Sequence, residues 1–147
     1  MKNRFLKLFL AIVFLETFPS ASAQTCEVDL SGEWRFQTDV MDFRRGSLSP
    51  RYNHKLQETI TLPGITDDYK IGYESPYRHV DRLTRVYEYM GPAWYQRDIE
   101  FPADWKGKRI FLYFERTHWL SSVWVDTKEV SRIDYISVPH NHDLTDF

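Results

Sequence analysis

The segment from Gly91 to Glu115 constrains the fold of this chain more than any other. Side chains from Trp94 to Phe101 alternate between apolar and polar, and those from Arg109 to Glu115 are mostly apolar on both faces. The turn residues Lys106-Gly107-Lys108 lie between the two runs. A period of two interrupted by turn residues is typical of antiparallel strands, not of helices. The segment therefore predicts a β-hairpin or a corner of a β-sandwich.

Strand-like alternation recurs at three further places, Glu33–Thr38, Leu56–Leu62 and Ser122–Asp126. In the last of these, strict alternation turns either Val123 and Val125 or Trp124 inward, but not both sets. Residues 39–55 and 66–90 have no sustained period and are predicted to be loops. At 147 residues the chain allows one domain. We expect an all-β antiparallel sandwich, incomplete at its C-terminal end because residues 143–147 read as the start of another turn and strand.

Aromatic residues make up 16% of the chain, with 5 Trp, 9 Tyr and 10 Phe. Buried aromatic side chains supply much of the apolar area that a sandwich core needs, whereas exposed rings can form a platform for sugars. For any single aromatic residue we favour the core interpretation.

Residues 1–23 have the pattern of a secretory signal peptide. Basic residues near the start, including Lys2 and Arg4, precede an apolar run over residues 8–15, and Ala21-Ser22-Ala23 forms a small-residue cleavage site. The apolar run is too short to span a membrane. The pattern predicts export to the periplasm or the extracellular space, with the folded domain over residues 27–147.

Removal of residues 1–23 changes the 19 basic and 21 acidic residues to 16 and 20, so the net charge falls from −2 to −4. A mildly acidic domain is a poor candidate for binding nucleic acid or anionic membranes. Cys26 is the only cysteine, which excludes an internal disulfide bond. Its position after the cleavage site leaves a lipid anchor as an alternative.

Two short patterns contain residue types that can carry chemistry. Asp67 and Asp68 follow Pro-Gly, and adjacent carboxylates there are more typical of a turn or a helix cap than of a glycosidase pair. His140 and His142 could place two imidazoles on one side of a strand for a metal ion, with His118, Asp143 or Asp146 as a third ligand. We favour a solvated or hydrogen-bonded loop.

Other patterns are weaker still. Ser121 and Ser122 have no recognisable base beside them in the sequence, and phosphate-binding and nucleophile-elbow motifs are absent. The polar cluster between Arg78 and Arg85, which includes His79, Asp81 and Arg82, is interpreted as a solvated loop face, with sugar or domain contacts as the alternative. We therefore assign no catalytic, cofactor-binding or metal-binding residue and expect no cofactor.

Five short strings, in register over residues 29–147, carry a family resemblance: Leu30–Phe36, Leu62–Gly64, Tyr89–Tyr95, Val123–Asp126 and Pro139–Thr145. They resemble, in order, the opening strand, the Leu-Pro-Gly turn, the Tyr-x-Gly-x-x-Trp-Tyr segment, the Val-Trp-Val-Asn-Gly hairpin and the Pro-His…Asp-Leu-Thr close of one domain. That domain is the N-terminal sugar-binding domain of glycoside hydrolase family 2.

The resemblance implies a galactose-binding-like jelly roll, followed in the family by an immunoglobulin-like sandwich and a (β/α)8 barrel. Family members are retaining exo-glycosidases of β-galactosides, β-glucuronides or β-mannosides, and their two catalytic glutamates lie in the barrel. No glutamate of this chain matches either role. The resemblance therefore implies the non-catalytic domain of an exported β-glycosidase, inactive alone, with β-galactosides preferred as substrates. A stand-alone exported carbohydrate-binding module is the alternative.

Two regions depart from the family pattern or match it loosely. Asp126-Thr127 replaces the usual Asn-Gly, which predicts a longer turn through Lys128 and Glu129. Residues Tyr73–Met90 correspond loosely to the family loop that approaches the active site, without a residue-by-residue match.

Overall fold

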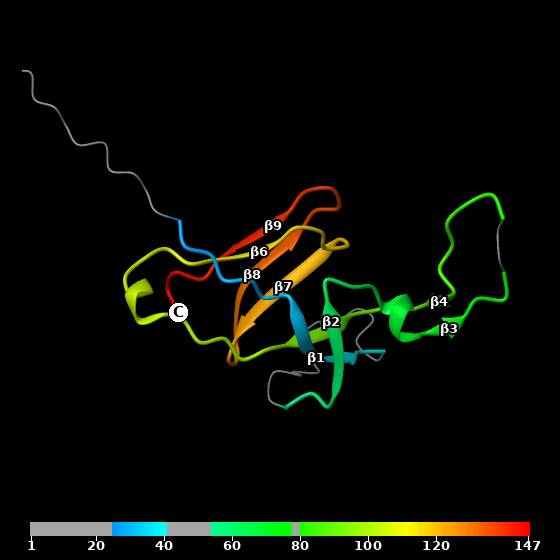
Figure 1. The fold of residues 1–147 in the computed structure, drawn as a ribbon, viewed down its shortest axis with the longest axis horizontal. Helices are drawn as coiled ribbons and strands as arrows, with labels where there is room; N and C mark the ends of the chain where they lie inside the picture. The colour runs from blue at the N-terminus through cyan, green and yellow to red at the C-terminus, as the bar shows by residue number, and fades with distance from the viewer. Residues whose placement is uncertain (1–24, 41–53, 78–79) are drawn as a thin grey trace, which may run out of the picture.

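The computed structural model describes residues 25–40, 54–77 and 80–147. The signal-peptide prediction and most of the loop predicted for residues 39–55 lie outside these ranges. The described residues form nine strands and two short 3-10 helices (Figure 1). The strands are β1 Gly32–Thr38, β2 Glu58–Leu62, β3 Tyr73–Glu74, β4 Tyr87–Glu88, β5 Ala93–Gln96, β6 Phe111–Phe114, β7 Leu120–Val125, β8 Lys128–Asp134 and β9 His140–Asp143; the helices are η2 Thr66–Tyr69 and η3 Ala103–Trp105.

All strand pairs are antiparallel. One sheet has the order β2-β1-β5, while β6 pairs with β9 and β7 pairs with β8. Strands β8 and β9 contact one another, so the four strands β6 to β9 form one layer beside the first sheet (Figure 1). The predicted fold class, an antiparallel jelly-roll β-sandwich, is confirmed.

The Gly91–Glu115 segment is a sandwich corner and not a hairpin. Its first strand, β5, pairs with β1, and its second, β6, pairs with β9. Pro102, which cannot donate to a strand ladder, comes just before η3, and Gly107 turns the chain with a φ of 78°. The hairpin alternative was wrong because the two strands pair with partners far away in the sequence.

The apolar core of the first sheet is formed by Trp34, Phe36 and Ile60, which are 8%, 1% and 1% exposed. Trp34 and Phe36 share one face of β1, as the alternation predicted. The Trp34 indole N–H donates to the Leu30 carbonyl at 2.8 Å, so its polar atom is satisfied inside the core. The Phe36 ring meets the Tyr95 ring edge-on at 5.1 Å.

The core interpretation was wrong for several other aromatic residues. Tyr113 is 58% exposed and Phe111 is 44% exposed, because both lie on the outer face of β6 while Leu112 and Phe114 are partly buried. Phe101 is 48% exposed. The outer surface of this sandwich therefore presents aromatic rings to solvent.

Strict alternation fails in β7. The β7–β8 register shifts between Val123 and Trp124, as at a β-bulge. Val123 is buried, and the neighbouring Trp124 ring lies 6.2 Å from the ring of Trp94 in β5. The shift lets the adjacent residues Val123 and Trp124 both contribute to the interior. Strict alternation predicted that only one of them would.

The β7–β8 turn is tight, contrary to the longer turn that the sequence predicted. Val125 pairs directly with Lys128, which leaves Asp126 and Thr127 as the two turn residues. Asp126 itself adopts the left-handed region with a φ of 52°, a conformation that Asp tolerates better than most residues.

The predicted loop over residues 66–90 contains η2 and the β3–β4 hairpin, and this arm extends away from the sandwich (Figure 1). Gly72 at its base has a φ of 110°, and a Cβ there would lie 2.2 Å from the Glu88 carbonyl oxygen. Only glycine permits this close approach of the two chains.

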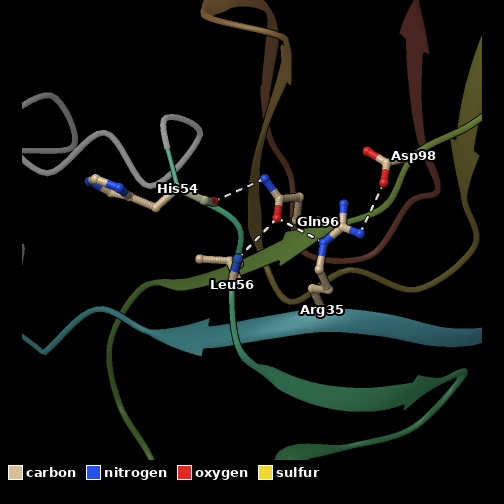
Figure 2. A network of polar contacts seen from close by, with 5 residues as sticks. All are labelled: Arg35, His54, Leu56, Gln96 and Asp98. Carbon is tan, nitrogen blue, oxygen red and sulfur yellow. Dashed lines mark hydrogen bonds and ion pairs between the residues drawn. The ribbon is translucent and has the colours of Figure 1, made fainter.

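A side-chain amide joins the first sheet to the segment before β2 (Figure 2). Gln96 Oε1 accepts hydrogen bonds from Arg35 Nε at 2.9 Å and from the Leu56 backbone N–H at 3.1 Å, and its Nε2 donates to the His54 carbonyl at 3.2 Å. Arg35 also pairs with Asp98 at 3.0 Å. Because Leu56 is buried, Gln96 supplies a partner for a backbone group that water does not reach.

We predict that Gln96→Ala lowers the free energy of unfolding by about 1–3 kcal/mol, because it leaves the Leu56 N–H without a partner. Gln57→Ala is the matched control, since the exposed Gln57 donates only to the Lys55 carbonyl. Urea denaturation of both variants measures the difference, and equal stabilities would contradict the assigned role of Gln96.

Candidate functional site

A pocket of about 540 Å³ opens at the end of the sandwich where β6 leads into β7 and β8 leads into β9. One wall comes from Tyr113 and residues 115–118, and the other from residues 136–139. Its volume lies in the range of small-molecule sites. The walls combine apolar groups from Tyr113, Ile136 and Val138 with charged or hydroxyl-bearing side chains.

Two contacts join the two walls, and a third closes the loop over residues 135–139. The ladder of β6 and β9 pairs Phe114 with His140, at the point where both loops begin. The Tyr135 N–H donates to the Trp119 carbonyl at 3.1 Å, and the Tyr135 carbonyl lies 2.9 Å from His140 Nε2. The loop over residues 135–139 is thus fixed at both ends.

His140 belongs to a buried polar cluster beneath this loop. Ser121 Oγ lies 2.6 Å from His140 Nδ1 and 2.9 Å from His142 Nε2. Both imidazoles are fully buried on the inner side of β9, and Ser121 approaches them from β7. One hydroxyl group therefore connects two strands that do not pair with each other.

The tautomers of the neutral rings follow from this network. The Tyr135 carbonyl can only accept, so His140 Nε2 carries the proton and its Nδ1 is an acceptor. The single hydroxyl proton of Ser121 then goes to His140 Nδ1, and His142 Nε2 must donate to the hydroxyl oxygen. The result is a one-way chain from His142 through Ser121 and His140 to the backbone of Tyr135.

This chain of hydrogen bonds leaves one buried imidazole nitrogen without a partner. Among the described residues, His142 Nδ1 has no hydrogen-bond partner. Protonation there would place a charged ring in the interior, and burial, with a smaller effect of His140, lowers the pKa of His142 below its ordinary value of 6.5. The ring of Phe114 packs edge-on against His142 at 5.7 Å. His142 is therefore built to remain neutral.

The metal hypothesis predicted correctly that His140 and His142 share one side of a strand. In the ranges that the structure describes, no group of three or more His, Cys, Asp or Glu side chains could hold a metal ion. Asp143 lies on the opposite, exposed face, and His118 lines the pocket. The preferred interpretation of His140 and His142 was a solvated or hydrogen-bonded loop. It was right that the two side chains are hydrogen-bonded, and wrong about a solvated loop, because both are buried in strand β9.

The Ser121–His140 contact is not a catalytic triad. The group that orients His140 is a backbone carbonyl and not a carboxylate, and the serine hydroxyl is engaged by two imidazoles. Ser122, on the other face of β7, is exposed.

The turn interpretation of Asp67 and Asp68 is confirmed, since both lie in η2. The Asp67 carboxylate accepts hydrogen bonds from the backbone N–H groups of Val86, at 3.1 Å, and Tyr87. Its role is to attach η2 to the base of the β3–β4 arm. Asp68 is exposed.

The other candidate residues lie at the surface. Asp81, Arg82 and Arg85 are exposed, as the solvated-face interpretation predicted, whereas Arg78 and His79 lie outside the described residues. Cys26 and Asp146 are also exposed.

The Asp143 side chain forms hydrogen bonds with Thr145 and Arg109 on the outer face of β9. Hydrogen bonds from the Thr145 hydroxyl and from Arg109 hold its pKa at about 2, below the ordinary value of 3.8. The Arg109 pairing, at 2.8 Å, joins strand β9 to the segment that leads into β6.

Sequence reasoning missed both the pocket and the serine–histidine contact. Neither loop carries a motif, and the sequence separation of 19 between Ser121 and His140 conceals their proximity. The available signal was the alternation itself, which places Ser121 with Val123 on one face of β7 and His140 with His142 on one face of β9.

Sequence comparisons connect the chain with glycosidases. It is 26% identical over 132 residues to the β-glucuronidase of Sus scrofa, covering 87% of this chain and 19% of that enzyme. It is 23% identical over 124 residues to the β-glucuronidase of Formosa agariphila, covering 84% of this chain and 12% of that enzyme. The chain therefore spans about a fifth or less of the length of these relatives. No family model matches it.

A solved structure agrees with the sandwich fold. The β-glucuronidase of an uncultured Clostridium species superposes with a TM-score of 0.58 at 20% identity, covering 84% of this chain and 21% of that one. The resemblance to glycoside hydrolase family 2 is confirmed. Over the ranges that the structure describes, the chain has no helix with the length and hydropathy of a membrane span.

We predict that Ser121→Ala lowers the free energy of unfolding by about 1–3 kcal/mol, because His140 Nδ1 and His142 Nε2 both lose their buried partner. Ser122→Ala, at the adjacent exposed position, should stay within about 0.5 kcal/mol of the unchanged protein. Chemical denaturation at neutral pH compares the two. Matching losses would show that the hydroxyl chain does not stabilise the fold.

We predict that stability falls as the pH drops below 6.5. The pKa of His142 is lower in the folded chain than in the unfolded chain, so the unfolded chain binds the proton first and gains population. The stabilisation is complete above pH 6.5 and is lost as the pH falls towards the folded pKa. His142→Phe, which keeps the Ser121–His140 bond, should flatten this part of the pH profile of urea midpoints. An unchanged slope would refute the assignment.

Proposed function

We propose that residues 27–147 are the N-terminal, non-catalytic sandwich domain of an exported retaining β-glycosidase. The observation that carries the proposal is the match to β-glucuronidases over 132 residues, 87% of this chain. The two carboxyl groups that cleave a glycosidic bond would come from a barrel domain of the same enzyme. The role of this domain would be to support that barrel and the intervening immunoglobulin-like domain.

The relatives favour β-glucuronides as substrates over the β-galactosides that the family resemblance first indicated. The relatives and the solved structure described above are all named β-glucuronidases. The structure adds a role for the β3–β4 arm, which projects from the sandwich (Figure 1). Tyr73 and Leu83 on this arm are 85% and 104% exposed, and we propose that the barrel domain covers them beside its substrate entrance.

Export is proposed on the strength of the signal-peptide pattern in residues 1–23. Intact-mass measurement of the chain recovered from the cell envelope tests it. A mature chain that starts at Gln24 supports export in free form, a lipid-modified Cys26 supports the anchored alternative, and an uncleaved chain in the cytoplasm contradicts both.

The second candidate function is a stand-alone carbohydrate-binding module. The observation that favours it is the pocket at the end of the sandwich, which has an exposed Tyr113 ring and polar side chains in its walls. A module would bind sugar without any catalytic partner.

We predict that the genomic sequence after the codon for Phe147, translated in its three frames, encodes in one of them an immunoglobulin-like sandwich and a barrel with two catalytic glutamates. The purified 147-residue chain should not hydrolyse 4-nitrophenyl β-glucuronide or β-galactoside, because it carries neither glutamate. Absence of barrel-coding sequence from every frame would contradict the glycosidase proposal and leave the module. Hydrolysis by the purified chain would contradict both.

A further inference from the structure

We propose that two copies of this chain associate by pairing their β6 strands edge to edge, antiparallel, about a two-fold axis at Leu112. Strand β6 pairs with β9 on one side, and no other strand among the described residues pairs with it (Figure 1). The second copy would occupy the remaining edge. This association involves only the described sandwich and does not depend on the proposed glycosidase activity.

The backbone groups of Phe111 and Tyr113 point to this remaining edge. The Leu144 N–H donates to the Ile110 carbonyl at 2.8 Å, so Ile110 directs its backbone groups towards β9. In an antiparallel ladder this direction alternates from one residue to the next. Leu112 therefore also faces β9, whereas the N–H and carbonyl groups of Phe111 and Tyr113 face away from it and can pair with a further strand.

Strand β6 lacks the features that prevent edge-to-edge pairing. Natural edge strands are commonly protected by charged side chains, Pro or a β-bulge. The sequence of β6 is Phe-Leu-Tyr-Phe, and its register with β9 runs without a shift. The outward rings of Phe111 and Tyr113 are 44% and 58% exposed. A paired strand would cover both the backbone groups and these rings.

The outer face of β6 is complementary to itself under a two-fold rotation. Arg109, Phe111, Tyr113 and Glu115 succeed one another along this face. With the axis at Leu112, Arg109 lies opposite Glu115 of the second copy, and Phe111 lies opposite Tyr113 of the second copy. Opposite charges and aromatic pairs stabilise antiparallel strands in such positions. The symmetry of the dimer forms each pair twice.

The same charges specify the register. Moving the axis by one residue in either direction places Arg109 opposite Tyr113 or opposite Thr117, neither of which carries a formal charge at pH 7. The axis at Leu112 places Arg109 opposite Glu115 instead. Of these three registers, it is therefore the one that pairs opposite charges.

Both charged side chains are accessible to a second copy. The side chains of Arg109 and Glu115 are 71% and 73% exposed. Arg109 donates to Asp143 through one guanidinium nitrogen at 2.8 Å, and a guanidinium has further N–H donors. The pair between Glu115 and Arg116 is exposed, with 3.7 Å between its charged atoms, and such loose pairs hold their members weakly.

Sedimentation velocity of the full chain between about 10 μM and about 1 mM tests the association. We expect a reversible equilibrium between monomer and dimer, because a short strand buries too little area for a permanent complex. Glu115→Arg should weaken the dimer about tenfold or more, since it places two cations opposite each other twice. Glu100→Arg, at an exposed position outside β6, is the matched control with the same change in net charge.

A mixture of two charge variants tests the register. Arg109→Glu should also weaken the dimer, but it removes the ion pair with Asp143 as well. The decisive readout is therefore an equimolar mixture of the Arg109→Glu and Glu115→Arg chains. One copy of each restores both opposite-charge pairs, so the mixture should associate more tightly than either variant alone.

Hydrogen exchange followed by NMR tests which backbone groups take part. The amide protons of Phe111 and Tyr113 should gain protection as the concentration rises. Those of Leu112 and Phe114 should be protected at every concentration, because they face β9.

A monomer throughout the concentration range would overturn the proposal, and so would a dimer that Glu115→Arg leaves unchanged or a mixture that does not recover. Growth to larger masses would contradict a closed two-fold pair. Protection of Phe111 and Tyr113 at every concentration would show that another segment covers the edge. If a charge variant fails to fold, Tyr113→Pro removes an edge donor that β9 does not use, and an undiminished dimer would then count against the pairing.

Discussion

One serine hydroxyl connects the two strand pairs, β7–β8 and β6–β9, that make up the second layer of this sandwich. Ser121 reaches from β7 to two fully buried imidazoles on β9, and His140 passes the connection on to the backbone of the loop before that strand. Every donor in this series of hydrogen bonds, from His142 to the Tyr135 carbonyl, has an acceptor. Buried polar groups stabilise a fold under that condition. The loop fixed by it forms one wall of the pocket, so the candidate ligand site depends on this interior contact.

The two layers achieve order by different means. The β2-β1-β5 sheet relies on the apolar contacts of Trp34, Phe36 and Ile60, with Gln96 satisfying backbone groups at its edge. The β7–β9 side buries Val123 together with polar rings. Polar contacts are directional, whereas apolar packing is not, so the buried hydrogen bonds constrain the loop over residues 135–139 in a way that apolar packing alone would not.

The sequence predicted the parts of the fold that depend on local patterns. Alternation located β1, with Trp34 and Phe36 inward, and the family strings gave the sandwich class. Pairing between distant strands has no local signature, so the Gly91–Glu115 corner stayed ambiguous with a hairpin. The polar composition of β9 favoured a loop over a strand, because its inward residues are histidines whose shared partner, Ser121, lies 19 and 21 positions away. The pocket was invisible for the same reason, since its walls meet only after β6 and β9 pair.

The most direct test of this account is a long-range ¹H–¹⁵N NMR measurement of the histidine tautomers at neutral pH. Both His140 and His142 should be neutral with the proton on Nε2, because the Tyr135 carbonyl and the Ser121 hydroxyl leave no other arrangement without an unpaired donor. The ¹⁵N shift of His142 Nδ1 should be that of a nitrogen without a hydrogen-bond donor. A proton on Nδ1 of either ring, or an imidazolium signal, would contradict the hydrogen-bond chain on which the loop and the pocket depend.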